Sequence, residues 1–187
     1  MQKELKLALD ILRKGGTILY PSDTIWGMGC DASSSEAVEK IYRIKGREKE
    51  KSMLILVSDE FMAERYVTEL PDIAFELFAL AEKALTLVIP GAKNLAPNIP
   101  APDGSIGMRI PDDPFCQALL RQFRRPIVSS SANFSGRPSP KDYYDIDSAL
   151  KEQVDHVVNW RQDDTRLHRA SSVIKLGLGG EIKILRK

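Results

Sequence analysis

Apolar and polar residues follow two different spacings along this chain, and segments of the two kinds alternate. In the first kind, apolar residues recur every three or four positions, which is the spacing of one buried face of a helix. In the second kind, three to five apolar residues run together between Gly, Pro or Ser, which is typical of buried strands. Segments of the first kind predict a helix that ends at Gly15-Gly16, one that opens at Ser33–Glu36, and others at 59–68, 72–84 and 113–123. Segments of the second kind predict strands at 17–20, 53–57, 86–89, 106–110, 126–128, 156–158, 173–174 and 182–185.

Local signals mark where several helices begin. Ser33-Ser34-Ser35-Glu36 fits a capping box, and Asp113-Pro114 combines an acidic cap with a proline in the first turn. The apolar stripe of the helix at 72–84 is predicted to comprise Ile73, Leu77, Leu80 and Ala81. The alternation of helices and strands predicts an α/β fold, a twisted mixed β-sheet flanked by helices, with residues 1–187 as a single domain.

Composition narrows the class of protein without naming a function. The chain has 187 residues, enough for one hydrophobic core, and a formal net charge of +1, so any site for a polyanion must be local. Cys30 and Cys116 lie far apart without metal-ligand spacing, which favours free thiols in a reducing compartment. The first residues contain no apolar signal core, and no apolar run reaches the length of a membrane span. We therefore expect a cytoplasmic protein with no membrane segment.

A run of alternating charges stands just before the strand at 53–57. The cations of this run are Lys45, Arg47, Lys49 and Lys51, and Gly46, Glu48 and Glu50 separate them. In an extended chain, alternate side chains project to one face, so the cations could converge on a polyanion. The interleaved glutamates also fit a solvated surface segment. The run alone leaves both interpretations open.

Other chemical motifs are incomplete. The segment 27–32 fits the dinucleotide pattern G-x-G-x-x-A, but about 20 residues further on the chain carries cations, where such a site needs an acidic residue. There is no Walker-type phosphate loop and no G-x-S-x-G nucleophile elbow. His156 and His168 are far apart and have no companion cysteines, so they favour structural roles and predict no metal site.

Four motifs, taken in order, give a more specific indication. They span Pro21–Ala32, Lys45–Lys51, Ser105–Pro111 and Ser131–Ser139, and together they extend over most of the chain. In this order they resemble the motifs of the YrdC-like (TsaC-type) threonylcarbamoyl-AMP synthases. The chain ends at Lys187, soon after its last predicted strand, and so resembles the short, single-domain form of that family.

The resemblance implies an enzyme with three substrates: L-threonine, bicarbonate and ATP. The amine of threonine and bicarbonate would give an N-carboxylate, which attacks the α-phosphorus of ATP and releases pyrophosphate. Such a reaction needs positioning and charge stabilisation and no protein nucleophile. Mg²⁺ would be held largely by the nucleotide. The product would pass to downstream tRNA threonylcarbamoyl-transfer proteins.

The resemblance also implies roles for individual residues. Arg47 and Lys51 would stabilise the charge of the triphosphate. The full set of ATP-binding candidates is Lys45, Arg47, Lys51, Ser105, Ser131, Asn133, Ser139 and Arg186. The threonine-binding candidates are Thr24, Arg109, Ser129 and Ser171. Among these, Arg109 would hold the carboxylate, a pairing that suits the guanidinium fork.

The chain departs from the family pattern at two informative places. Leu56 stands where many relatives have histidine, and the segment 161–170 is charged where relatives are rich in glycine. The wall of the site formed by that segment is therefore the part that the resemblance specifies least.

Two other function classes remain open at this level. The first is an RNA-binding module of the same fold, with tRNA or double-stranded RNA as partner and the basic run on phosphates. The run lacks interleaved aromatic residues for base stacking, and the net charge is near zero. The second is the related module of hydrogenase-maturation proteins, which needs zinc-finger-like cysteines in partner domains, whereas this chain has two cysteines.

Overall fold

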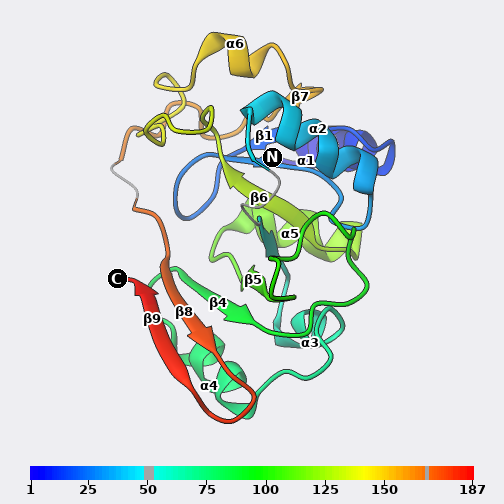
Figure 1. Ribbon diagram of the computed structural model, residues 1–187. Helices are drawn as coiled ribbons and strands as arrows, with labels where there is room; N and C mark the ends of the chain where they lie inside the picture. The colour runs from blue at the N-terminus through cyan, green and yellow to red at the C-terminus, as the bar shows by residue number, and fades with distance from the viewer. Residues whose placement is uncertain (49–52, 167–168) are drawn as a thin grey trace.

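A computed structural model of the protein describes residues 1–48, 53–166 and 169–187 (Figure 1). The helices within them are α1 (Gln2–Arg13), α2 (Ser35–Lys45), α3 (Glu60–Glu64), α4 (Asp72–Leu80), α5 (Pro114–Phe123) and α6 (Ser148–Lys151). The strands are β1 (Ile18–Tyr20), β2 (Gly27–Gly29), β3 (Leu54–Leu56), β4 (Leu85–Ile89), β5 (Ile106–Arg109), β6 (Ile127–Ser131), β7 (His156–Val157), β8 (Ser172–Leu176) and β9 (Ile182–Arg186).

These strands form one sheet in the order β7-β1-β2-β6-β3-β5-β4-β8-β9. Three neighbouring pairs are parallel, namely β1 with β7, β3 with β5, and β4 with β8, and the other neighbours are antiparallel. Figure 1 shows β4, β8 and β9 at one end of the molecule, β1, β7 and α6 at the other, and β6 between them. The predicted mixed sheet flanked by helices is confirmed.

Residues of the central strands alternate between two hydrophobic cores. In β1, Ile18 packs in the core that contains the buried residues of α1 and α5, whereas Leu19 packs in the core that contains those of α2, α3 and α4. In β3, Leu56 packs in the core of α1 and α5, and Ile55 packs in the core of α2, α3 and α4. A strand that is buried on both faces requires this period of two. The sheet is therefore covered by helices on both sides.

Helix caps explain where several elements begin, with one shift from expectation. The side chain of Asp113 accepts a hydrogen bond of 2.8 Å from the backbone N–H of Cys116, which confirms the predicted cap of α5. The cap of α2 is Ser34, which accepts from the backbone N–H of Ala37. The expected capping box was placed one residue early, because the hydroxyl of Ser33 bonds to Asp31 instead.

Other expectations for the helices were partly wrong. The helix at 59–68 is shorter than expected and ends at Glu64. In α4 the buried residue is Ala74, whereas Leu80 is 77 % exposed, so the predicted apolar stripe does not face the core along its whole length. β2 and α6 were not predicted. β2 carries two glycines in three residues, which gives no strand signal.

Further expectations concern the cysteines and the membrane. Cys30 and Cys116 are free, as predicted, and both are buried, which raises the pKa of both thiols. Of the helices in the described ranges, none is long and apolar enough to cross a membrane.

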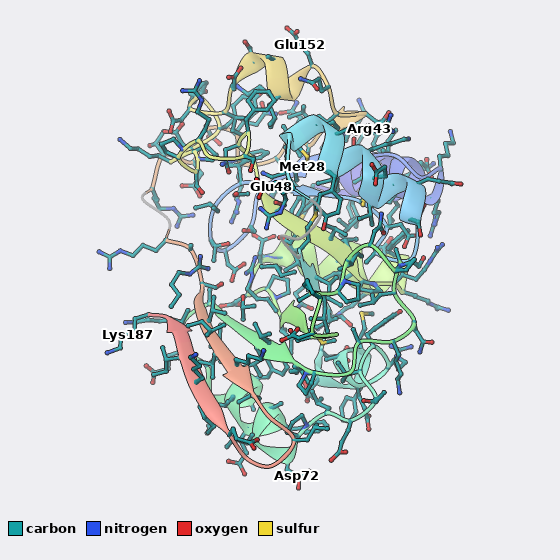
Figure 2. The ribbon with its side chains drawn as sticks, in the orientation of Figure 1. Met28, Arg43, Glu48, Asp72, Glu152 and Lys187 are labelled. Atoms are coloured by element: carbon teal, nitrogen blue, oxygen red, sulfur yellow. The ribbon has the colours of Figure 1, made fainter. Side chains whose placement is uncertain are left out.

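Figure 2 shows Met28 in the interior, and Asp72 and Glu152 at opposite ends of the molecule.

Candidate functional site

A cavity of about 330 Å³ lies on the face of the sheet that also carries α1 and α5. Leu54 lines this cavity, and Leu56, on the same side of β3, packs in the core of α1 and α5. Gly107 also lines it from the neighbouring strand β5. A Cβ atom at Gly107 would lie 3.1 Å from the Cβ of Leu54 and 3.4 Å from Cγ2 of Thr86, so the absent side chain keeps this part of the cavity open.

The register of four strands brings distant residues into one row beside the cavity. Arg109 of β5 pairs with Thr86 of β4, Thr86 pairs with Val173 of β8, and Val173 pairs with Arg186 of β9. Directly paired residues point to the same face of a sheet. All four side chains therefore reach the same cavity.

Most residues assigned to the substrates from sequence line this single cavity. From the threonine side these are Thr24, Arg109, Ser129 and Ser171, and from the nucleotide side Arg47, Ser131, Ser139 and Arg186. Strands supply some of them, and the loops around the sheet supply the others. Lys45, Ser105 and Asn133 lie elsewhere, and Lys51 falls outside the described residues.

The loop between β1 and β2 presents Thr24 in a fixed orientation. Ser22 donates its hydroxyl proton to the backbone carbonyl of Ile25 at 2.9 Å. The hydroxyls of Ser22 and Thr24 lie 2.9 Å apart, and the backbone N–H of Thr24 donates to Ser22 Oγ at 3.1 Å. Because Ser22 has already used its proton, Thr24 is the donor between the two hydroxyls. Thr24 Oγ1 therefore keeps acceptor capacity for a ligand.

Arg109 is buried and paired within the site. Its Nη1 lies 2.5 Å from Oδ1 of Asp23, and the two side chains are 3 % and 12 % exposed. This ion pair fixes the direction of the guanidinium, which has five N–H donors in a rigid fork. The donors that Asp23 does not use are available to an anion in the cavity. The sequence did not single out Asp23, although it lies in the first of the four motifs.

Thr86 and Arg186 hold Ser171 at the opposite edge. The hydroxyls of Thr86 and Ser171 lie 2.8 Å apart, and both residues are buried. Arg186 donates from Nε to the backbone carbonyl of Ser171 at 2.9 Å and from Nη2 to its hydroxyl at 3.4 Å. Sequence reasoning missed Thr86, because the threonine in a short apolar strand gives no signal until the strand pairing is known.

Lys45 occupies a structural position beside the cavity. It is 2 % exposed, and its ammonium donates to the backbone carbonyls of Ser131 and Asn133, the second at 2.5 Å. Burial, and secondarily the charge of Arg47, lower the pKa of Lys45 to about 8. Lys45 therefore ties the end of α2 to the end of β6 and to the loop that follows.

Ser105 and Asn133 also make contacts within the protein. The hydroxyl of Ser105, which is 4 % exposed, donates to Asp103 at 2.6 Å. The amide of Asn133 donates to the backbone carbonyls of Phe134 and Arg137 at 2.9 and 2.7 Å. Asn133 lines a different cavity of about 370 Å³. Their assignment to the nucleotide stays a prediction.

The glycines of the G-x-G pattern have a packing role. A Cβ atom at Gly27 would lie 2.8 Å from the ring of Tyr20, and one at Gly29 would lie 2.6 Å from the carbonyl of Val128. Both glycines belong to strand β2, whereas a dinucleotide fingerprint forms a turn between a strand and a helix. They make room for Tyr20, and the dinucleotide interpretation is wrong.

The described residues contain no group of three His, Cys, Asp or Glu side chains that could hold a metal ion. Arginine side chains and the hydroxyl-bearing residues Thr24, Thr86, Ser129, Ser130, Ser131, Ser139 and Ser171 line the cavity, together with apolar residues such as Trp26, Met53 and Leu54. Fold and cavity together define an α/β protein with a polar pocket on one sheet face that suits an anionic ligand.

Comparison with known proteins identifies the family. The profile of the Sua5/YciO/YrdC family, described as "Telomere recombination", matches residues 10–187. The chain belongs to this family. Two proteins named threonylcarbamoyl-AMP synthase are similar to it. The one from Stenotrophomonas maltophilia is 34% identical over 84% of this chain and 87% of its own length, and the one from Pseudoalteromonas translucida is 30% identical over 84% and 86%.

Solved structures show the same fold. P. abyssi Sua5 complexed with L-threonine has a TM-score of 0.79 and 26% identity, over 92% of this chain and 50% of that one. This chain thus spans half the length of that Sua5 protein. E. coli YciO has a TM-score of 0.85 and 26% identity, over 100% of this chain and 90% of that one.

Proposed function

We propose that this protein is an L-threonylcarbamoyladenylate synthase, a nucleotidyltransferase that forms threonylcarbamoyl-AMP and pyrophosphate from L-threonine, bicarbonate and ATP. The observation that carries the proposal is the convergence of both sets of assigned residues on one cavity, with Thr24 and Arg109 in one set and Arg47 and Arg186 in the other. The names of the relatives and the Sua5 complex with L-threonine support the choice of reaction and of amino acid.

The threonine half of the cavity offers complementary groups for an amino acid. The guanidinium of Arg109, oriented by Asp23, provides donors for the α-carboxylate. Thr24 Oγ1 keeps acceptor capacity for the α-amine, because its own proton goes to Ser22. The hydroxyl of Ser171 faces the same space. A carboxylate donor set and an amine acceptor within one cavity favour an α-amino acid over a simple carboxylic acid.

The nucleotide half is proposed to surround the triphosphate with Arg47, Arg186 and the hydroxyls of Ser131 and Ser139. These positive and donor groups would stabilise the charge that moves onto the leaving pyrophosphate. Bicarbonate would react with the amine of threonine between the two halves to give the carbamate and one water. A carbamate oxygen would then attack the α-phosphorus and displace pyrophosphate. Mg²⁺ would be bound by the phosphate oxygens, which fits a cavity lined by hydroxyls and arginines rather than by carboxylates. We also propose that the protein acts in the cytosol, since its cysteines are free.

A pyrophosphate-release assay tests this function. We expect release with ATP, bicarbonate and threonine together, and background rates when threonine or bicarbonate is left out. Serine should react about fivefold less efficiently, because it lacks a methyl group whose burial is worth roughly 1 kcal/mol. Pyrophosphate release that is independent of the amino acid would contradict the proposal.

The product would serve other proteins that transfer the threonylcarbamoyl group to tRNA. Direct binding of tRNA or double-stranded RNA is a separate hypothesis, which needs a cationic surface that contacts several phosphates. Binding of that kind would weaken steeply as salt is raised, with a slope that reports the number of phosphates contacted. A titration of labelled tRNA at several salt concentrations measures it.

A further inference from the structure

Arg161 and Asp164, in the charged segment that follows β7, lie beside the loop that carries Thr24. At its start, Arg161 adopts a left-handed backbone conformation with φ of 52°, which non-glycine residues rarely do. A narrow crevice separates the segment from the loop, and it is lined by Arg161, Asp164, Pro21, Ser22, Thr24, Ile25, Trp26, Lys141 and Asp142. The resemblance to the family does not specify a role for this segment. The contacts of Arg161 indicate one.

Arg161 joins two parts of the protein that are far apart in sequence. Its Nη1 lies 3.0 Å from Oδ2 of Asp113, whose side chain is completely buried. Its Nη2 donates to the backbone carbonyl of Ser22 at 2.9 Å. Asp113 uses its other oxygen to cap α5. The guanidinium therefore links the first turn of α5 to the second residue of the Thr24 loop.

The residue that Arg161 holds is the one that orients Thr24. Ser22 accepts from the backbone N–H and the hydroxyl of Thr24 and donates to Ile25. A second tie lies alongside, where Cys116 Sγ donates to the carbonyl of Pro21 at 3.3 Å. A thiol is a weak donor, whereas a guanidinium paired with a buried carboxylate is a strong one. Arg161 is therefore the stronger of these two ties on the loop.

We propose that Arg161 is a positioning residue for the amino-acid substrate: anchored on Asp113, it fixes the carbonyl of Ser22 and thereby the orientation of the Thr24 hydroxyl in the cavity. This inference rests on the proposed function for its choice of substrate. It assigns a role in amino-acid binding to a residue that none of the four sequence motifs contains and that does not line the cavity itself.

The test replaces Arg161 with methionine and lysine. Arg161→Met keeps length and apolar contacts but removes both contacts of the guanidinium. We expect the KM for threonine to rise about tenfold, which corresponds to the loss of one hydrogen bond to a charged group, while the KM for ATP changes less than twofold. Arg161→Lys should fall between, because an ammonium lacks the planar fork that reaches both acceptors together. Arg166→Ala is the matched control, because Arg166 lies on the same segment, is exposed and pairs with Asp164. It should leave both KM values unchanged.

A second variant separates positioning from folding stability. Arg161→Met leaves Asp113 buried and without its ionic partner, and could therefore destabilise the fold. In the double variant Asp113→Asn, Arg161→Met that charge is gone, while asparagine can still cap α5. We expect its thermal stability to recover and its KM for threonine to stay high. Recovery of the KM together with stability would overturn the proposal, as would equal rises in the KM values for threonine and ATP.

Hydrogen exchange gives a readout that does not depend on activity. The amide of Thr24 is bonded to Ser22, so it should exchange faster in Arg161→Met than in wild type and at the wild-type rate in Arg166→Ala. If the wild-type protein shows no threonine-dependent pyrophosphate release, the proposed function fails, and exchange at Thr24 still decides whether Arg161 holds the loop. Unchanged exchange in Arg161→Met would overturn the inference even if the enzyme activity is established.

Discussion

Removal of the Arg109 side chain should weaken threonine binding much more than ATP binding. The guanidinium is 3 % exposed, is oriented by its 2.5 Å contact with Asp23, and faces the cavity with its remaining donors. A hydrogen bond to a charged group is worth about 1.5–3 kcal/mol when solvent is excluded. At about 1.4 kcal/mol per factor of ten, Arg109→Ala should weaken threonine binding by about 10- to 150-fold.

The same substitution has a second consequence, which a paired variant isolates. Without Arg109, the nearly buried carboxylate of Asp23 loses its partner, and breaking a buried ion pair costs about 3–5 kcal/mol of stability. Because Asp23 is 12 % exposed, we expect a loss at the lower end of that range. The double variant Asp23→Asn, Arg109→Ala should recover most of the stability without recovering threonine affinity.

Calorimetric titration of each ligand and urea unfolding measure the two effects separately. The reasoning is refuted if folded Arg109→Ala binds threonine as tightly as wild type. It is also refuted if the double variant recovers threonine affinity together with stability, because Arg109 would then act through the fold alone.

Three further predictions concern other parts of the site. Burial lowers the pKa of Lys45 to about 8, so from pH 8 to about 10 the unfolded chain binds more protons than the folded one. Over this range, urea unfolding should show the free energy of unfolding of wild type rise by about 2–3 kcal/mol relative to that of Lys45→Met. The raised thiol pKa values act in the opposite direction but cancel in this difference, and a difference that does not change with pH would contradict the prediction. Thr86→Val should cost about 1 kcal/mol of stability and lower kcat/KM for threonine, since it removes the bond to Ser171, whereas Thr86→Ser should restore both in unfolding and steady-state assays. Arg47→Ala and Lys51→Ala should each raise the KM for ATP at saturating threonine, whereas Lys49→Ala should have less effect. Lys49 and Lys51 both lie outside the described residues. If all three substitutions leave the KM unchanged, the run is a solvated surface.

Much of the fold could be predicted, because residues that are close together in sequence determine its main helices and strands. The apolar spacing before Gly15-Gly16 and the Asp113 cap each fix a helix through residues that are adjacent in sequence. Strand β2 could not be predicted, because Gly27 and Gly29 are selected by the ring of Tyr20 on the neighbouring strand and not by strand propensity. The exposure of Leu80 was missed for a related reason, since the length of a buried stripe depends on what covers it.

In the candidate site, too, some residues could be predicted from the sequence and others could not. Residues within motifs, such as Thr24 and Ser139, could be assigned from sequence by resemblance and line the cavity. Thr86 and Arg161 could not, because their partners Ser171 and Ser22 are 85 and 139 positions away and meet them only through strand pairing and loop packing. Lys45 illustrates the converse case, in which a motif position was assigned to phosphate but donates to backbone carbonyls in this structure.

The most direct test of the proposed activity is detection of the adenylate itself. The protein would be incubated with ATP, Mg²⁺, radiolabelled bicarbonate and threonine, and the nucleotide products separated by chromatography and identified by mass. We predict one product that contains the bicarbonate carbon, threonine and AMP in equal amounts, formed together with an equal amount of pyrophosphate. Pyrophosphate or AMP that appears without bicarbonate carbon in a nucleotide product would contradict the proposed function.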